Sequence, residues 1–96
     1  MNSQPKIDLA DLGKFFSQKI KNIRCAWYVA REIQAEWGTF VHAGDGNRGS
    51  RMAKQHLKQN DGKPSLEAET WIAFARQNRE QIETIILTEK IFSKII

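Results

Sequence analysis

The sequence predicts an all-α fold: a small bundle of two long helices, at about 8–37 and 65–95, joined by a Gly-rich loop and a short basic helix at about 50–60. Three observations favour this class. Apolar residues recur at steps of three and four in both long segments, capping residues stand at their starts, and only two prolines occur in 96 residues. At this length we expect a single helical domain, residues 1–96.

The first long helix is predicted to begin at Asp8. The Asp8 carboxylate can accept hydrogen bonds from the free amides of the first turn, and Asp11 adds negative charge at the positive end of the helix dipole. Ile7 and Leu12 occupy the two positions of a hydrophobic staple around this cap. Gly38 is a natural stop. Between these ends, one face is apolar at helical spacing: Leu9, Leu12, Phe16, Ile20, Ile23, Trp27, Ala30 and Trp37.

Three glycines in the middle of the chain, Gly44, Gly46 and Gly49, form a G-x-G-x-x-G pattern. In dinucleotide-binding folds, such glycines follow a strand within a βαβ unit. Only Phe40-Val41 could begin a strand here, and no parallel partner follows it. The pattern therefore favours a flexible loop between helices over a nucleotide site.

The short basic helix, at about 50–60, is predicted to end at Asn60-Asp61-Gly62. At about 100° per residue, its two sides differ in chemistry. The packing side consists of Met52, Ala53, His56 and Leu57. The other side carries four cations: Arg48, Arg51, Lys54 and Lys58. Because arginine can donate to phosphate oxygens in bidentate fashion, these four residues are the first candidates for contact with a polyanion.

The second long helix is predicted to begin with Ser65 as its N-cap, directly after Pro64. From Ile85 onward it is apolar on more than one face, and no turn signal interrupts it. Such an end is either buried in the chain's own bundle or covered by another subunit, and we expect the second. A piece of a longer protein is a further possibility that the bare apolar end leaves open. The candidate interface residues are Ile91, Phe92, Ile95 and Ile96, with Trp37 as an exposed anchor beside Gly38.

Basic residues outnumber acidic ones, 15 to 11, and the excess is concentrated in the middle of the chain. Residues 38–64, with five basic and two acidic groups, have a net charge of +3; residues 65–96, with four and five, have −1. A second basic stripe is expected on the first helix, where one sector holds Lys14, Lys21, Arg24 and Arg31, with Tyr28 among them. Such a stripe can follow a nucleic-acid backbone and stack on a base, but it would also serve as an ordinary solvated face.

Side chains that could carry catalysis or hold a metal form no recognisable pattern. Cys25, the one cysteine, lies next to an apolar helix face and is expected to be a buried, inert thiol. His42 and His56 lack cysteine or carboxylate partners at metal-ligand spacing. We therefore predict a protein without enzyme activity, metal or cofactor. No apolar run is long enough to span a bilayer and the N-terminus lacks the apolar core of a signal peptide, so we expect a soluble, cytoplasmic protein without membrane contact.

These features favour non-catalytic binding of a nucleic-acid backbone, DNA or RNA, with little sequence specificity. The chain would act as a small helical subunit of a larger nucleoprotein assembly or as a homo-oligomer. One alternative is a protein–protein adaptor or inhibitor that docks through its apolar C-terminal helix and its basic face. A helix-turn-helix transcription factor is disfavoured, because the loop Gly38–Gly49 is longer than the turn of about three to four residues in that motif. No motif assigns the chain to a family.

Overall fold

Five helices make up the part of the chain that the computed structural model describes, which is residues 6–95, with side chains up to residue 93. They are α1 (Leu9–Lys19), α2 (Ile23–Trp37), α3 (Ala43–Gln59), α4 (Leu66–Gln77) and α5 (Arg79–Ile95). In these residues there is no strand, and a single isolated parallel bridge joins Asp8 to Phe40. The all-α class is confirmed, but the two long helices are wrong, because each of them is broken.

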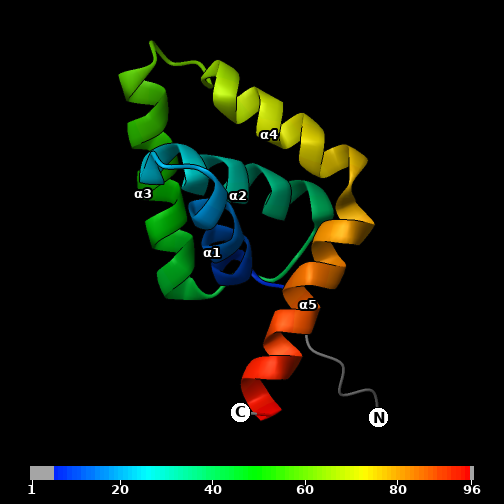
Figure 1. Cartoon of the computed structure of the whole chain (residues 1–96). Coiled ribbons are helices and arrows are strands. Elements are labelled where there is room, and N and C mark those ends of the chain that lie inside the picture. The colour runs from blue at the N-terminus through cyan, green and yellow to red at the C-terminus, as the bar shows by residue number, and fades with distance from the viewer. Residues whose placement is uncertain (1–5, 96) are drawn as a thin grey trace.

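The central helix of the fold is α2. It packs against α1, α3 and α4, whereas the backbone of α5 comes close only to α1 and α4 among the described helices. Figure 1 shows α3 along one side of the body and α5 on the opposite side, leading toward the C-terminus. The molecule measures 46 × 28 × 24 Å along its principal axes. Within residues 6–95, none of the helices combines the length and the apolar character that crossing a membrane requires.

The cap at the start of α1 is formed as predicted. Asp8 Oδ1 accepts a hydrogen bond from the Asp11 amide at 2.9 Å, and Asp11 Oδ2 accepts one from the Asp8 amide at 2.9 Å, which completes a capping box. Ile7 and Leu12 are buried around it. At the end of α2, Gly38 adopts the left-handed conformation, with φ 68°, as expected for a helix stop.

The first predicted long helix is interrupted at Ile20–Asn22. Ile20 is extended, and the Asn22 side chain begins α2 by accepting hydrogen bonds from the amides of Arg24 and Cys25 at 3.0 and 3.2 Å. An asparagine that caps a new helix competes with continuation of the old one. The apolar pattern conceals this break, because its steps of three and four continue across the turn.

The Gly-rich segment is helical, so the predicted loop and the predicted start of the short helix are both wrong. α3 begins at Ala43 and has 17 residues, ending at Asn60 as expected. A Cβ at Gly49 would lie 2.9 Å from Leu9 Cδ2, and one at Gly46 would lie 2.9 Å from Val41 Cγ1. These two glycines allow close packing of α3 rather than a flexible loop.

The second predicted long helix is interrupted at Asn78. Ser65 caps α4 as predicted, because its Oγ accepts a hydrogen bond from the Ala68 amide at 3.1 Å. At the other end, Asn78 Nδ2 donates to the Phe74 carbonyl oxygen at 2.9 Å, and the Asn78 backbone N–H donates to the same carbonyl at 3.0 Å. This local bonding ends α4, and α5 leaves in a different direction (Figure 1).

The core is built around the indole of Trp27. A Cβ at Gly13 would lie 2.6 Å from Trp27 Cζ2, and a Cβ at Gly49 would lie 3.7 Å from Trp27 Cε3. The ring therefore sits between α1 and α3. On the α1 side there is room for it only because residue 13 has no side chain. The guanidinium of Arg48 lies over the same ring, 5.5 Å from its centroid.

Gly13→Ala tests this packing. A methyl group at residue 13 would overlap the rigid Trp27 indole, so we expect the free energy of unfolding to fall by about 1–3 kcal/mol, although alanine is the better helix former. Gly44→Ala is the matched control, because a Cβ there meets nothing within 4 Å. It should raise stability by up to about 1 kcal/mol. Urea denaturation followed by circular dichroism measures both, and equal stability of the two variants would contradict the role given to Gly13.

Candidate nucleic-acid interface

The outward side of α3 carries four exposed cations. Arg48, Arg51, Lys54 and Lys58 are all exposed and fall within about 120° of the helix circumference. The opposite side is packed, with Gly49 and His56 buried, as the sequence predicts for this helix. The one acidic residue of α3, Asp45, lies partly buried in the first turn.

Within residues 6–93, none of these four cations pairs with a carboxylate. The arginine and lysine ion pairs of that region involve other helices: Arg76 with Glu36 at 2.8 Å, Arg79 with Glu83 at 3.4 Å and Lys90 with Asp11 at 2.9 Å. Charge is segregated in the same way. Four basic residues and one acidic residue give α3 a net charge of +3, whereas four basic and five acidic residues give α4 and α5 together −1. The potential of the molecule is therefore most positive along α3.

The second basic stripe does not form as a single surface, because it assumed an unbroken helix. Arg24 lies beside α3, where its Nε donates to Gln55 Oε1 at 2.7 Å. Arg31 is partly buried on the inner side of α3. Lys21 is exposed in the turn between α1 and α2, and Lys14 lines a groove between α1 and α5. Of the four, Arg24 is the one that extends the outward face of α3.

Tyr28 is buried, so the expectation that it could stack on a base is wrong. Its ring lies against His56, with centroids 5.0 Å apart and planes tilted by 34°. His56 is 4% exposed, and its Nε2 accepts a hydrogen bond from the Ser65 amide at 3.1 Å. An accepting ring nitrogen carries no proton, so His56 is held as the neutral tautomer. Burial lowers the pKa of His56, and the charge of Glu67 opposes this only in part.

Cys25 is buried, as predicted, next to the cap of α4. Its Sγ lies 3.7 Å from Ser65 Oγ. Burial raises the pKa of the Cys25 thiol, and this effect is larger than the opposing effect of the hydrogen bond with Ser65. The protonated thiol is therefore the stable form and a poor nucleophile. Within residues 6–95, no cluster of three or more His, Cys, Asp or Glu side chains is placed to hold a metal ion.

The predicted partner-interface residues do not share one environment. Trp37 is 8% exposed, so it is not an exposed anchor; it lies beneath the Arg79 guanidinium, 5.0 Å from the ring centroid, and joins the end of α2 to the start of α5. Ile91 and Phe92 are exposed, Phe92 at 59%. Two further residues, Ile95 and Ile96, lie outside the part of the chain whose side chains are described.

The sequence gives no sign of an apolar groove between α1, α4 and α5. Its lining includes Phe15, Trp71, Phe74 and Ile85. Phe74 and Ile85 are exposed, and the Trp71 ring packs edge-on against Phe74 with centroids 5.5 Å apart. Because three helices contribute to the groove, it depends on the direction that α5 takes after Asn78. A periodicity within one segment cannot reveal it.

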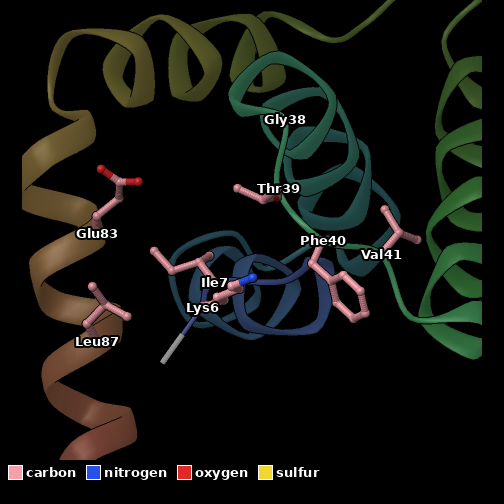
Figure 2. A pocket seen from close by; sticks show the side chains of 8 residues that line it. All are labelled: Lys6, Ile7, Gly38, Thr39, Phe40, Val41, Glu83 and Leu87. Carbon is pink, nitrogen blue, oxygen red and sulfur yellow. The ribbon is translucent and has the colours of Figure 1, made fainter. Parts of the chain in front are cut away.

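A cleft of about 590 Å³ separates α5 from the connection between α2 and α3. Figure 2 shows Glu83 and Leu87 of α5 on one side, Thr39 on the other and Ile7 between them. Thr39 Oγ1 is buried and has no hydrogen-bond partner among the described residues. None of the predicted cationic site residues lines this cleft, so it is separate from the outward face of α3.

Fold and surface together define a small all-α protein with one strongly cationic helix exposed along its length. A scan against models of protein families gave no match, and searches of curated proteins and of solved structures also gave no match. The function is therefore inferred from the geometry of the site alone.

The neutral, buried His56 predicts a loss of stability in acid. The ordinary pKa of 6.5 applies to the unfolded chain and the folded pKa is lower, so between the two the unfolded state binds more protons. The free energy of unfolding should therefore decrease as the pH falls below about 6.5, whereas above that pH it should not depend on His56. Thermal melts between about pH 5 and pH 8 measure this.

Two variants separate His56 from other titrating groups. His56→Gln should be less stable at neutral pH but should lose this part of the pH dependence. His42→Gln, at an exposed position where the imidazole contacts Asp8 Oδ2 at 3.1 Å and not His56, should keep it. An unchanged acid slope in His56→Gln would show that other groups cause it.

Proposed function

We propose that this protein binds the phosphate backbone of nucleic acid, DNA or RNA, through the outward face of α3, without catalysing a reaction. The observation that carries the proposal is that Arg48, Arg51, Lys54 and Lys58 are exposed together and have no carboxylate partner within residues 6–93. Cations that neutralise phosphates release condensed counterions, which drives binding independently of sequence. A cytoplasmic location and a role as a small subunit of a nucleoprotein assembly accord with this function.

The spacing of the cations suits a regular backbone. From Arg48 to Lys58, α3 rises by about 15 Å. One strand of DNA presents a phosphate about every 3.4 Å along its axis, so this stretch faces about four phosphates. The inner side of α3 is packed on α1 and α2, and Arg24 adds a cation at its flank. Because packing already orders the backbone of α3, only the cationic side chains have to be immobilised on binding, which lowers the cost of association.

Lys54→Gln combined with Lys58→Gln should weaken binding to fluorescent DNA. Two phosphate contacts would be lost, so the slope of log K against log salt concentration should become shallower by about 1.8 for a duplex. Fluorescence anisotropy at several salt concentrations measures both the affinity and the slope.

The control for this experiment is Lys19→Gln combined with Arg76→Gln. It removes the same charge from α1 and α4, away from the outward face of α3. It should leave the slope nearly unchanged. Equal effects of the two double variants would show that binding does not occur on α3, and absence of binding at low salt would refute the proposed function.

A second proposal concerns the apolar face of α4 and α5, which we infer is covered by a second copy of this chain. This face contains the groove lined by Trp71, Phe74 and Ile85. It also has a projecting side chain, the exposed Phe92. Ile85 and Phe92 are two turns apart and lie within about 20° of each other around α5. An antiparallel pairing of two α5 helices would set each Phe92 against the groove of the other copy. Such self-complementarity is what a two-fold interface requires.

Phe92→Ser should convert a dimer into a monomer without loss of stability, because the side chain is 59% exposed in the single chain. Leu66→Ser, at an exposed position at the start of α4, should leave the dimer intact. Sedimentation velocity at micromolar concentration measures both. A monomeric wild-type protein would contradict self-association, and this face would then be available to a different protein, as an adaptor or inhibitor requires.

A further inference from the structure

The connection between α2 and α3 is much shorter than the sequence predicts. α2 ends at Trp37 and α3 begins at Ala43, so five residues join them, and Gly38 turns the chain in the left-handed region. A helix-turn-helix joins its two helices by a turn of about three to four residues that often contains glycine. The connection here is only slightly longer than that, and much shorter than the predicted loop from Gly38 to Gly49.

α3 packs on both α1 and α2. On its inner side, Gly49 faces Leu9 of α1, and His56 stacks on Tyr28 of α2. Figure 1 shows the outer side of α3 clear of the other helices along its whole length. An α-helix with its side chains is about 10–12 Å across, and the major groove of B-DNA is about 12 Å wide. The exposed side of α3 thus has the dimensions of a helix that enters this groove.

Two exposed side chains of α3 have the chemistry that reads bases. Asn47 and Arg51 lie about one turn apart on the outward side. In the major groove, the amide of asparagine pairs with adenine and the guanidinium of arginine pairs with guanine, each through two hydrogen bonds. Lys54 and Lys58 follow toward the C-terminus and can reach phosphates as point charges. A recognition helix has the same order, since its N-terminal residues contact base edges.

Gly44 leaves the start of the outward side of α3 without a side chain, although the fold has room for one. It is exposed, it has no positive φ, and a Cβ there would meet nothing within 4 Å. The fold therefore does not require glycine at this position, unlike at Gly13, although alanine is the better helix former. Gly44 lies seven residues before Arg51 and on the same side of α3. A glycine there lets the backbone of α3 approach a bound surface closely.

We infer that α3 docks in the major groove of duplex DNA, with Asn47 and Arg51 at base edges and Gly44 where the backbone comes closest. This inference rests on the proposed function. It adds duplex DNA as the substrate class and a sequence preference that backbone contacts alone do not provide.

Selection from a random duplex library, followed by fluorescence anisotropy, tests the inference. The enriched duplex should bind at least about fivefold tighter than a scrambled duplex at the same salt concentration, as one bidentate base contact provides. It should also bind tighter than an RNA duplex of the same sequence, whose major groove is too deep and narrow for side chains to read.

Three variants assign the contacts. Arg51→Lys keeps the charge but loses the bidentate geometry of the guanidinium, so it should remove the preference at the base pair that Arg51 contacts, with little change in binding to the scrambled duplex. Lys54→Gln should weaken binding to the enriched and the scrambled duplex by the same factor. Gly44→Gln should weaken binding to duplex DNA and leave binding to heparin unchanged. Circular dichroism verifies that each variant folds.

The outcomes separate the two levels of the proposal. If no sequence is enriched, or if RNA duplexes and single strands bind as tightly as duplex DNA, groove docking is wrong and backbone binding stands. If no nucleic acid binds even at low salt, both are wrong. Loss of the preference at one base pair in Arg51→Lys, with nonspecific binding retained, is the result that supports docking in the groove.

Discussion

The indole of Trp27 is the contact on which the rest of the structure depends. It is carried by α2, lies against Gly13 of α1 and reaches Gly49 of α3, so three helices meet at one ring. The helices can approach the ring this closely because Gly13 and Gly49 have no side chains. Because the Arg48 guanidinium lies over the same ring, the core itself positions the first cation of the outward face of α3.

Two asparagines decide how the remaining chain is arranged. Asn22 is the N-cap of α2, and Asn78 is the C-cap of α4. The chain changes direction at both places, so that five shorter helices form where two long ones were predicted. Ile82 and Ile86 are buried and anchor α5 in the core, and polar contacts hold it near both ends. Arg79 covers Trp37 at one end, and near the other end Lys90 Nζ donates to Asp11 Oδ2 at 2.9 Å, inside the capping box of α1. Ile85, Ile91 and Phe92 of α5 remain exposed.

The two proposed surfaces lie on different sides of the molecule, with α3 on one side and α5 on the other (Figure 1). Binding of a polyanion to α3 and pairing of two copies through α5 are therefore compatible. Charge supports the same division, because α3 is strongly positive while α4 and α5 together are slightly negative.

Local features of the structure were predictable from the sequence. The all-α class, the caps at Asp8 and Ser65 and the stop at Gly38 are observed as predicted. So is the division of α3 into a packed side and a cationic side. Each of these depends on hydrogen bonds between residues a few positions apart or on the helical period. Both can be read directly from the sequence, because they involve neighbouring residues only.

Only the tertiary structure decided which of these local features share a surface. The Gly-rich segment is helical because Gly49 packs against Leu9 and Trp27, and that contact overrides the preference of glycine for loops. Arg24 joins α3 whereas Lys14 lies beside α5, since the breaks in the chain turn their helices in different directions. The sequence by itself determined the caps at Asp8 and Ser65, the stop at Gly38 and what the two sides of α3 carry. Which sides meet depends on how separate helices pack, and contacts distant in the sequence set that packing.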